Sequence, residues 1–244
     1  MTTTLNNGIE MPLVGFGTYQ ITDPGECEHS VLTAIESGYR LIDTAQNYGN
    51  ERAVGSAVRS CGVARKELFI TSKVWFRNHK EGECRASVMR SLERLGLDYI
   101  DLMLIHWPFG DVYAAWRDLE ALYKEGVLRA IGVSNFSPDR LVDLINFNQV
   151  VPAVNQVETH LYCQQKEGHE WMGKYKVLHQ AYAPPGTEPD QRYVPPAPSP
   201  GGGQGSRQDP GPGGPAVSGP AGHFGHSQVG TPGAHSGEHR RVRL

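Results

Sequence analysis

Seven short apolar runs alternate with longer amphipathic segments along the first 183 residues of this 244-residue chain. The runs have the length and β-branched content of strands, at residues 13–17, 40–43, 68–74, 100–105, 129–134, 153–158 and 177–182. The segments between them place apolar residues at helical spacing, at residues 26–37, 51–60, 82–95, 113–125 and 137–147. Apolar strands joined by helices pair in parallel and are buried on both faces. The pattern therefore predicts an α/β fold.

Turn residues support these boundaries. Four of the amphipathic segments are followed by a glycine, as a C-terminal helix cap is, at Gly38, Gly62, Gly96 and Gly126. Ser137 followed by Pro138 is a good helix start, because serine caps the end and proline suits the first helical position. Residues 2–11, around an Asn-Asn-Gly turn, predict an opening hairpin before the first strand.

Polar residues at the strand ends favour a barrel over a doubly wound sheet. Asp43, Lys73 and His106 each end an apolar run, and barrels draw their sites from the carboxyl ends of many strands. A doubly wound fold concentrates its site at one switch point, after a glycine-rich loop. The Gly-Phe-Gly at residues 15–17 lacks the third glycine of that loop. We therefore expect a (β/α)8 TIM barrel.

Asp43, Lys73, His106 and the nearby Tyr48 together indicate proton-donating chemistry. Charged groups are costly to bury singly, so strands that end in such groups suggest that the groups meet. Tyrosine has a pKa of about 10, and we expect the Lys73 ammonium to lower it. Asp43 would then hold Lys73, and a neutral His106 would orient a substrate oxygen. Each residue alone is more often structural; their ordered occurrence on successive strand ends indicates catalysis.

Six ordered motifs make residues 5–184 resemble an aldo-keto reductase. The motifs are Gly15–Tyr19, Leu41–Glu51, Thr71–Trp75, Leu104–Pro108, Ile131–Phe136 and Asn155–Glu158. The resemblance implies reduction of aldehyde or ketone groups of small molecules to alcohols, with NADPH as the hydride donor. It also implies that Tyr48 is the general acid of a tetrad completed by Asp43, Lys73 and His106.

The same resemblance implies the remaining site residues. Cofactor contacts are implied for Thr18, Tyr19, Asp43, Ser134, Asn135, Gln156 and Tyr182. Ser134, Asn135 and Gln156 would hydrogen-bond the nicotinamide carboxamide, while Tyr182 would stack on the ring. Substrate contacts are implied for Tyr19, Tyr48, Trp75, His106 and Trp107, and Phe109 would help to line the pocket. No metal is implied.

Composition separates the last quarter of the chain from the rest. Residues 184–244 hold 12 of the 17 prolines and 14 of the 29 glycines, and they contain no lysine. Such a content without a period is typical of disordered sequence. We therefore expect an incomplete barrel over residues 1–184, truncated after its seventh strand, and a disordered Gly/Pro-rich tail over residues 185–244. The first and seventh strands of that barrel would be left unpaired.

The remaining sequence features are ordinary. The net charge of −3 calls for neither nucleic acid nor an anionic membrane, and the three arginines at residues 240–243 are a weak basic signal. The four cysteines form no Cys-x-x-Cys pair. No secretory signal or run of about 18 apolar residues occurs. We expect a cytoplasmic monomer with free thiols.

Two functional classes stay open. An intact tetrad favours an NADPH-dependent reductase. The family's C-terminal Ile-Pro-Lys-Ser segment, which grips the 2′-phosphate of NADPH, does not occur in this sequence. Its absence favours an inactive barrel fragment or a non-catalytic nucleotide-binding module.

A shifted reading frame accounts for the missing segment. When the codons of residues 226–239 are read one base out of phase, they permit Ile-Pro-Lys-Ser followed by Arg and Asn. The Gln228/Val229 junction then encodes only Lys or Arg, and residues 208–216 permit the helix-like Lys-Thr-Pro-Ala-Gln-Val-Ala-Leu. We hypothesise that residues 185–244 are a frameshifted reductase C-terminus, whether the shift lies in the gene or in its sequencing.

Resequencing the gene across codons 180–190 tests the frameshift. We expect a single-base insertion or deletion near codon 184, after which the restored frame encodes Ile-Pro-Lys-Ser. An uninterrupted reading frame with ordinary codon usage through residues 185–244 contradicts the hypothesis.

Overall fold

Parallel strands in chain order form the wall of an α/β barrel. The computed structural model describes residues 1–183 and 225–229. Each strand pairs in parallel with the next along the chain. The strands are β3 (Val14–Gly17), β4 (Leu41–Asp43), β5 (Phe69–Val74), β6 (Ile100–Ile105), β7 (Leu128–Ser134), β8 (Val154–Glu158) and β9 (Leu178–Tyr182). The predicted TIM-barrel class, with its parallel strands ending after the seventh, is confirmed.

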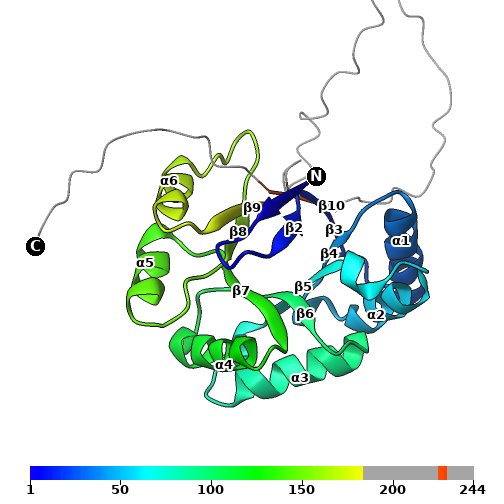
Figure 1. The fold of residues 1–244 in the computed structure, drawn as a ribbon, viewed down its shortest axis with the longest axis horizontal. Coiled ribbons are helices and arrows are strands. Elements are labelled where there is room, and N and C mark those ends of the chain that lie inside the picture. Colours follow the sequence, from blue (N-terminus) through cyan, green and yellow to red (C-terminus); the bar gives the residue numbers. More distant parts are fainter. Residues whose placement is uncertain (184–224, 230–244) are drawn as a thin grey trace, which may run out of the picture.

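Helices surround this ring of strands (Figure 1). The helices are α1 (Pro24–Glu36), α2 (Glu51–Ser60), α3 (Glu83–Leu95), α4 (Val112–Lys124), α5 (Pro138–Asn146) and α6 (Lys166–Lys174). Within the described residues, three 3-10 turns lie in the connections, η1 (Gln46–Tyr48), η2 (Arg65–Glu67) and η3 (Phe76–Asn78). The apolar pattern predicts the first five helices and misses α6. That helix buries only Met172, so it carries too few apolar residues to give a periodic signal.

The expectation of two unpaired barrel edges is wrong. Strand β10 (Gly225–Val229) lies between β3 and β9 and pairs antiparallel with both, which closes the ring. Ser227 lies opposite Gly15 of β3, and Gln228 lies opposite Ala181 of β9. Free backbone groups on a strand edge accept any extended segment that reaches them. The rest of the predicted tail lies outside the described residues.

An antiparallel hairpin closes the amino-terminal end of the barrel. It consists of β1 (Thr2–Thr4) and β2 (Glu10–Pro12), as the sequence predicts. Leu5 and Met11 are buried in the same apolar cluster as the inward-facing residues of the strands. The Asn6 amide donates to the Pro152 carbonyl oxygen at 3.0 Å, just before β8 begins. The hairpin therefore leaves the carboxyl end of the barrel for a site.

Two apolar clusters sandwich the strands because side chains alternate between the two faces of a strand. Ile70 and Val74 of β5 face outward into the large cluster between strands and helices. Phe69 faces inward with Leu102 and Leu104 of β6. The inward row of β5 continues at its carboxyl end with Lys73, which is buried. The same alternation that builds the core thus delivers a charged group to the open end of the barrel.

Helices α2 and α3 pack closely where Gly55 lies against the backbone of Leu95. A Cβ atom on Gly55 would lie 2.1 Å from the Leu95 carbonyl oxygen, a backbone atom that cannot swing aside. We expect Gly55→Ala to lower the free energy of unfolding by about 1–3 kcal/mol through overpacking. Gly173→Ala in α6 is the matched control, because no atom lies within 4 Å of its Cβ position. It should raise stability by up to about 1 kcal/mol. Urea denaturation measures both, and equal effects would contradict the close approach.

Candidate active site

Four polar side chains meet at the carboxyl end of the barrel. Asp43 is the last residue of β4, Lys73 is the penultimate residue of β5, and His106 directly follows β6. Tyr48 ends η1, in the connection after β4. Asp43 and Lys73 are 4% and 1% exposed, so their charges lie in the protein interior. The structure therefore brings together all four residues of the predicted tetrad.

Lys73 is the centre of this group. Its ammonium donates to the Asp43 carboxylate, to the Thr44 carbonyl oxygen at 3.0 Å and to the Tyr48 hydroxyl at 3.4 Å. Burial alone would lower the pKa of Lys73, but Asp43 and Tyr48 together outweigh burial and the net pKa is raised. The second Asp43 oxygen accepts from the Gln156 amide at 2.8 Å. The ammonium is thus charged and has three acceptors, as a buried cation requires.

The hydroxyl of Tyr48 keeps its proton more firmly than the sequence predicts. Burial raises the pKa of Tyr48, while the Lys73 ammonium lowers it and the Asp43 carboxylate raises it. The expected lowering by Lys73 is therefore wrong for the net direction. The main reason is burial of the phenol, which disfavours the charged phenolate, and the Asp43 carboxylate adds to it by offsetting part of the attraction of the Lys73 ammonium. Tyr48 therefore stands as a protonated phenol beside the ion-paired ammonium of Lys73.

His106 is a neutral imidazole. Burial, followed by the nearby Lys73 charge and His79, lowers the pKa of His106 to about 3. Its ring lies 5.8 Å from the Tyr48 ring, centroid to centroid, in an edge-on arrangement. Its Nδ1 is buried and has no hydrogen-bond partner within residues 1–183 and 225–229. A neutral histidine beside a phenol can donate a hydrogen bond to a substrate oxygen without bringing a second positive charge to the site.

Aromatic rings surround the tetrad. The ring centroids of Trp75 and Trp107 lie 5.4 and 6.2 Å from that of His106. Tyr19, 60% exposed, lies 5.1 Å from the Tyr48 ring. Phe109 stacks on Trp107 with centroids 5.7 Å apart. The structure thus places every predicted substrate residue around one mouth. Sequence reasoning missed Phe76, which contacts both Trp75 and Phe109.

Three further strand ends carry a polar cluster beside the tetrad. Asn135 donates to the His106 carbonyl oxygen and to the Ser134 hydroxyl, both at 3.1 Å. Its own oxygen accepts from the Tyr182 hydroxyl at 2.9 Å. Ser134 donates to the Gln156 carbonyl oxygen at 2.9 Å. These predicted cofactor residues are thus brought together, and the side-chain groups of Ser134 and Asn135 are already engaged with each other.

Thr18, also predicted to contact the cofactor, is fully buried. Its hydroxyl donates to the Asp43 carbonyl oxygen at 3.1 Å. Asn50, which sequence reasoning missed, donates to the Thr18 and Ile21 carbonyl oxygens at 2.9 and 3.1 Å and accepts from the Thr44 hydroxyl at 2.8 Å. Its place in the Leu41–Glu51 motif is the only sequence signal that pointed to it. Both residues hold the chain that follows β3 against the end of β4.

Gln46 and His79 were also missed. Gln46 contacts Trp75 and Asn78, and His79 lies 2.7 Å from the Phe109 carbonyl oxygen through Nδ1. Both residues tie together loops that carry the aromatic wall. Neither stands at the end of a strand, so no strand-end pattern could have found them.

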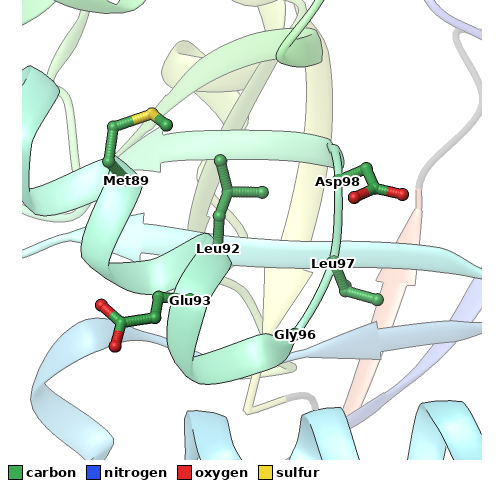
Figure 2. Close-up of a pocket in the computed structure, with 6 residues that line it drawn as sticks. All are labelled: Met89, Leu92, Glu93, Gly96, Leu97 and Asp98. Carbon is green, nitrogen blue, oxygen red and sulfur yellow. The ribbon is translucent and has the colours of Figure 1, made fainter.

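A separate hollow of about 500 Å³ lies on the outer surface, at the end of α3 (Figure 2). It is lined by Met89, Leu92, Glu93, Gly96, Leu97 and Asp98. Asp98 lies two residues before β6 begins, so the hollow is at the opposite end of the strands from the tetrad. Its lining contains two carboxylates, Glu93 and Asp98, but no tyrosine, histidine, cysteine, lysine or arginine, and it is not a candidate active site.

Residues 1–183 and 225–229 contain no group of three His, Cys, Asp or Glu side chains that could hold a metal ion. Over the same ranges, every helix is too short or too polar to cross a membrane.

Comparison with known proteins gives one consistent match. The model of the Aldo/keto reductase family matches residues 13–184. A glyoxal reductase of Bacillus subtilis is 47% identical over 184 residues, which cover 75% of this chain and 67% of the relative. The chain thus spans about two thirds of the length of the curated relatives that it matches.

Solved structures agree with the fold. An aldo/keto reductase from Brucella melitensis superposes with a TM-score of 0.74 at 39% identity, covering 75% of this chain and 73% of that one. A Bombyx mori aldo-keto reductase in complex with NADP superposes with a TM-score of 0.74 at 30% identity, covering 81% and 71%.

The stability of the fold should depend on the buried ion pair between Lys73 and Asp43. Asp43→Ala leaves the Lys73 ammonium buried without its carboxylate, which should lower the free energy of unfolding by about 3–5 kcal/mol. Lys73→Met strands the carboxylate and should cost a similar amount. The double variant leaves neither charge, so its loss should be well below the sum of the two single losses. Chemical denaturation of all four proteins measures the coupling, and strictly additive losses would show that the two charges do not depend on each other.

Proposed function

This chain belongs to the aldo/keto reductase family, and on that premise we propose that it reduces carbonyl groups of small molecules to alcohols with NADPH. The observation that carries the proposal is the buried contact between the Lys73 ammonium and both the Asp43 carboxylate and the Tyr48 hydroxyl. It sets a protonated phenol at the mouth of the barrel. Aromatic side chains around that mouth suit a small organic substrate.

The residues at the mouth fit the nicotinamide end of the cofactor. Tyr182 is only half-buried and has its hydroxyl fixed by Asn135, so one aromatic ring is held ready for stacking. The Gln156 nitrogen donates to Asp43, which leaves the amide oxygen for a carboxamide N–H. The hydrogen bond from the Asn135 amide to the Ser134 hydroxyl would break, and both side chains would then bond to the same carboxamide. When bound, NADPH supplies the hydride.

Tyr48 would supply the proton. As the carbonyl carbon accepts the hydride, the electron pair of the C=O bond moves to the oxygen, which then takes the Tyr48 proton. The raised pKa of Tyr48 keeps the phenol protonated until this oxygen becomes strongly basic. Lys73, 3.4 Å from the phenol oxygen, would stabilise the phenolate that is left. Asp43 holds Lys73 in place and does not touch the substrate.

His106 and the aromatic wall would orient the substrate. A neutral imidazole near the phenol can donate to the carbonyl oxygen. Trp75 and Trp107, whose ring centroids lie 5.4 and 6.2 Å from that of His106, would restrict how a substrate enters. Fixing the oxygen between His106 and Tyr48 would present the carbonyl carbon to the hydride donor. A cytoplasmic location, a monomeric state and independence from nucleic acid and membranes stay predictions, as does the division at residue 184.

A second candidate is a nucleotide-binding module without turnover. It is favoured by one observation, the absence from the sequence of the Ile-Pro-Lys-Ser segment that the family resemblance assigns to the 2′-phosphate. In that case the tetrad would be a structural remnant, and any cofactor affinity would come from the nicotinamide end alone.

Tyr48→Phe separates the two candidates. We expect the wild-type chain to oxidise NADPH in the presence of glyoxal, followed by absorbance at 340 nm. Removing the phenol hydroxyl should lower kcat by roughly 10²–10⁴-fold, the usual contribution of a general acid. NADPH binding, followed by quenching of tryptophan fluorescence, should be unchanged because the ring remains.

Tyr123→Phe, a half-buried tyrosine of α4, is the matched control and should keep full turnover. NADPH binding without wild-type turnover would support the second candidate. Turnover that survives Tyr48→Phe would overturn the role of Tyr48.

A further inference from the structure

The side-chain amide of Gln46 makes four hydrogen bonds. Its oxygen accepts from the Trp75 backbone N–H at 3.0 Å and from the Asn78 amide at 2.9 Å. Its nitrogen donates to the hydroxyls of Ser87 and Ser91, both at 3.1 Å. An amide has two acceptor lone pairs and two donor hydrogens, so Gln46 is fully satisfied.

Only one orientation of this amide is chemically allowed. The Trp75 backbone group can only donate, so it must face the Gln46 oxygen. The Ser87 hydroxyl donates to the Cys84 carbonyl oxygen at 2.8 Å, and the Ser91 hydroxyl donates to the Ser87 carbonyl oxygen at 3.3 Å. With their single hydrogens used inside α3, both hydroxyls present lone pairs to the Gln46 nitrogen. The hydroxyls of α3 therefore fix the Gln46 amide in the orientation that turns its oxygen toward the Trp75 N–H.

These bonds join the two loops that carry the proton donor and the pocket wall. Gln46 begins η1, and Tyr48 ends it two residues later. Trp75 directly follows β5, two residues after Lys73. The described contacts between these loops therefore include the Gln46 bonds on the outer side and the Tyr48–Lys73 contact on the inner side. The Tyr48–Lys73 contact, at 3.4 Å, is longer than the bond from the Trp75 N–H to Gln46, at 3.0 Å. If the Gln46 bonds were lost, the longer contact would have to hold the two loops in register.

We propose that Gln46 is a positioning residue that sets the distance between Tyr48 and Lys73 and fixes Trp75 in the substrate pocket. The inference rests on the proposed function. Gln46 is bonded to neither the tetrad nor the predicted carboxamide residues, so it acts through the loops that it joins. It should therefore influence proton donation and substrate binding and leave cofactor binding unchanged.

Gln46→Met tests the proposal, because it keeps the length of the side chain and removes all four hydrogen bonds. We expect kcat/KM for glyoxal to fall by roughly 10–100-fold, the effect of a misplacement of about 1 Å. The Kd for NADPH should stay at the wild-type value. Asn6→Ala is the matched control: it removes one amide hydrogen bond at the opposite end of the barrel and should leave kcat/KM unchanged.

Amide hydrogen exchange measures the hydrogen bond between the Trp75 N–H and Gln46 directly, and the measurement needs no enzymatic activity. The Trp75 N–H should exchange faster in Gln46→Met than in wild type, because it loses its acceptor. The His106 N–H, which donates to the Val74 carbonyl oxygen at 3.1 Å, should keep its rate. Unchanged Trp75 exchange would overturn the inference even if the chain has no activity. Faster exchange with unchanged kcat/KM in an active chain would also overturn it, whereas an inactive wild type would count against the proposed function alone.

Discussion

The buried ion pair between Lys73 and Asp43 is the constraint on which the site depends. Two charges in the interior are tolerated only when they face each other and their remaining hydrogen-bonding capacity is used. Thr44 and Tyr48 take the other hydrogens of the ammonium, and Gln156 occupies the second carboxylate oxygen. The pair therefore ties β4, β5 and β8 together at their carboxyl ends. Chemistry and architecture use the same contacts.

Side-chain amides hold the loops above this pair. Asn50 joins the chain after β3 to the end of β4, Gln46 joins η1 to η3 and α3, and Asn135 joins β6 to β7 and β9. An amide carries both donors and acceptors, so one side chain can satisfy backbone groups from several loops at once. Rigid support of this kind is what a site needs if it is to hold reacting groups in place.

Much of the barrel could be predicted because its signals are local. Strand and helix periods differ, and glycines mark the ends of segments, so the first five helices and all seven parallel strands are visible in the sequence. Helix α6 was missed because it buries only Met172. The pairing of β10 was missed because nothing local in Gly225–Val229 shows that it meets β3 and β9. Pairing between residues so far apart is decided by which edges stay open in three dimensions.

The strand-end positions of Asp43, Lys73 and His106 can be read from the amino-acid sequence alone, since each lies at the end of an apolar run. How those groups act on one another depends on the folded arrangement. The pKa of Tyr48 is raised because burial and the carboxylate of Asp43 outweigh the Lys73 ammonium. Such a balance depends on distances and burial that arise when separate strands meet, and no single stretch of sequence contains it. The bonding of Gln46 was likewise hidden, because its partners lie 29 or more residues away.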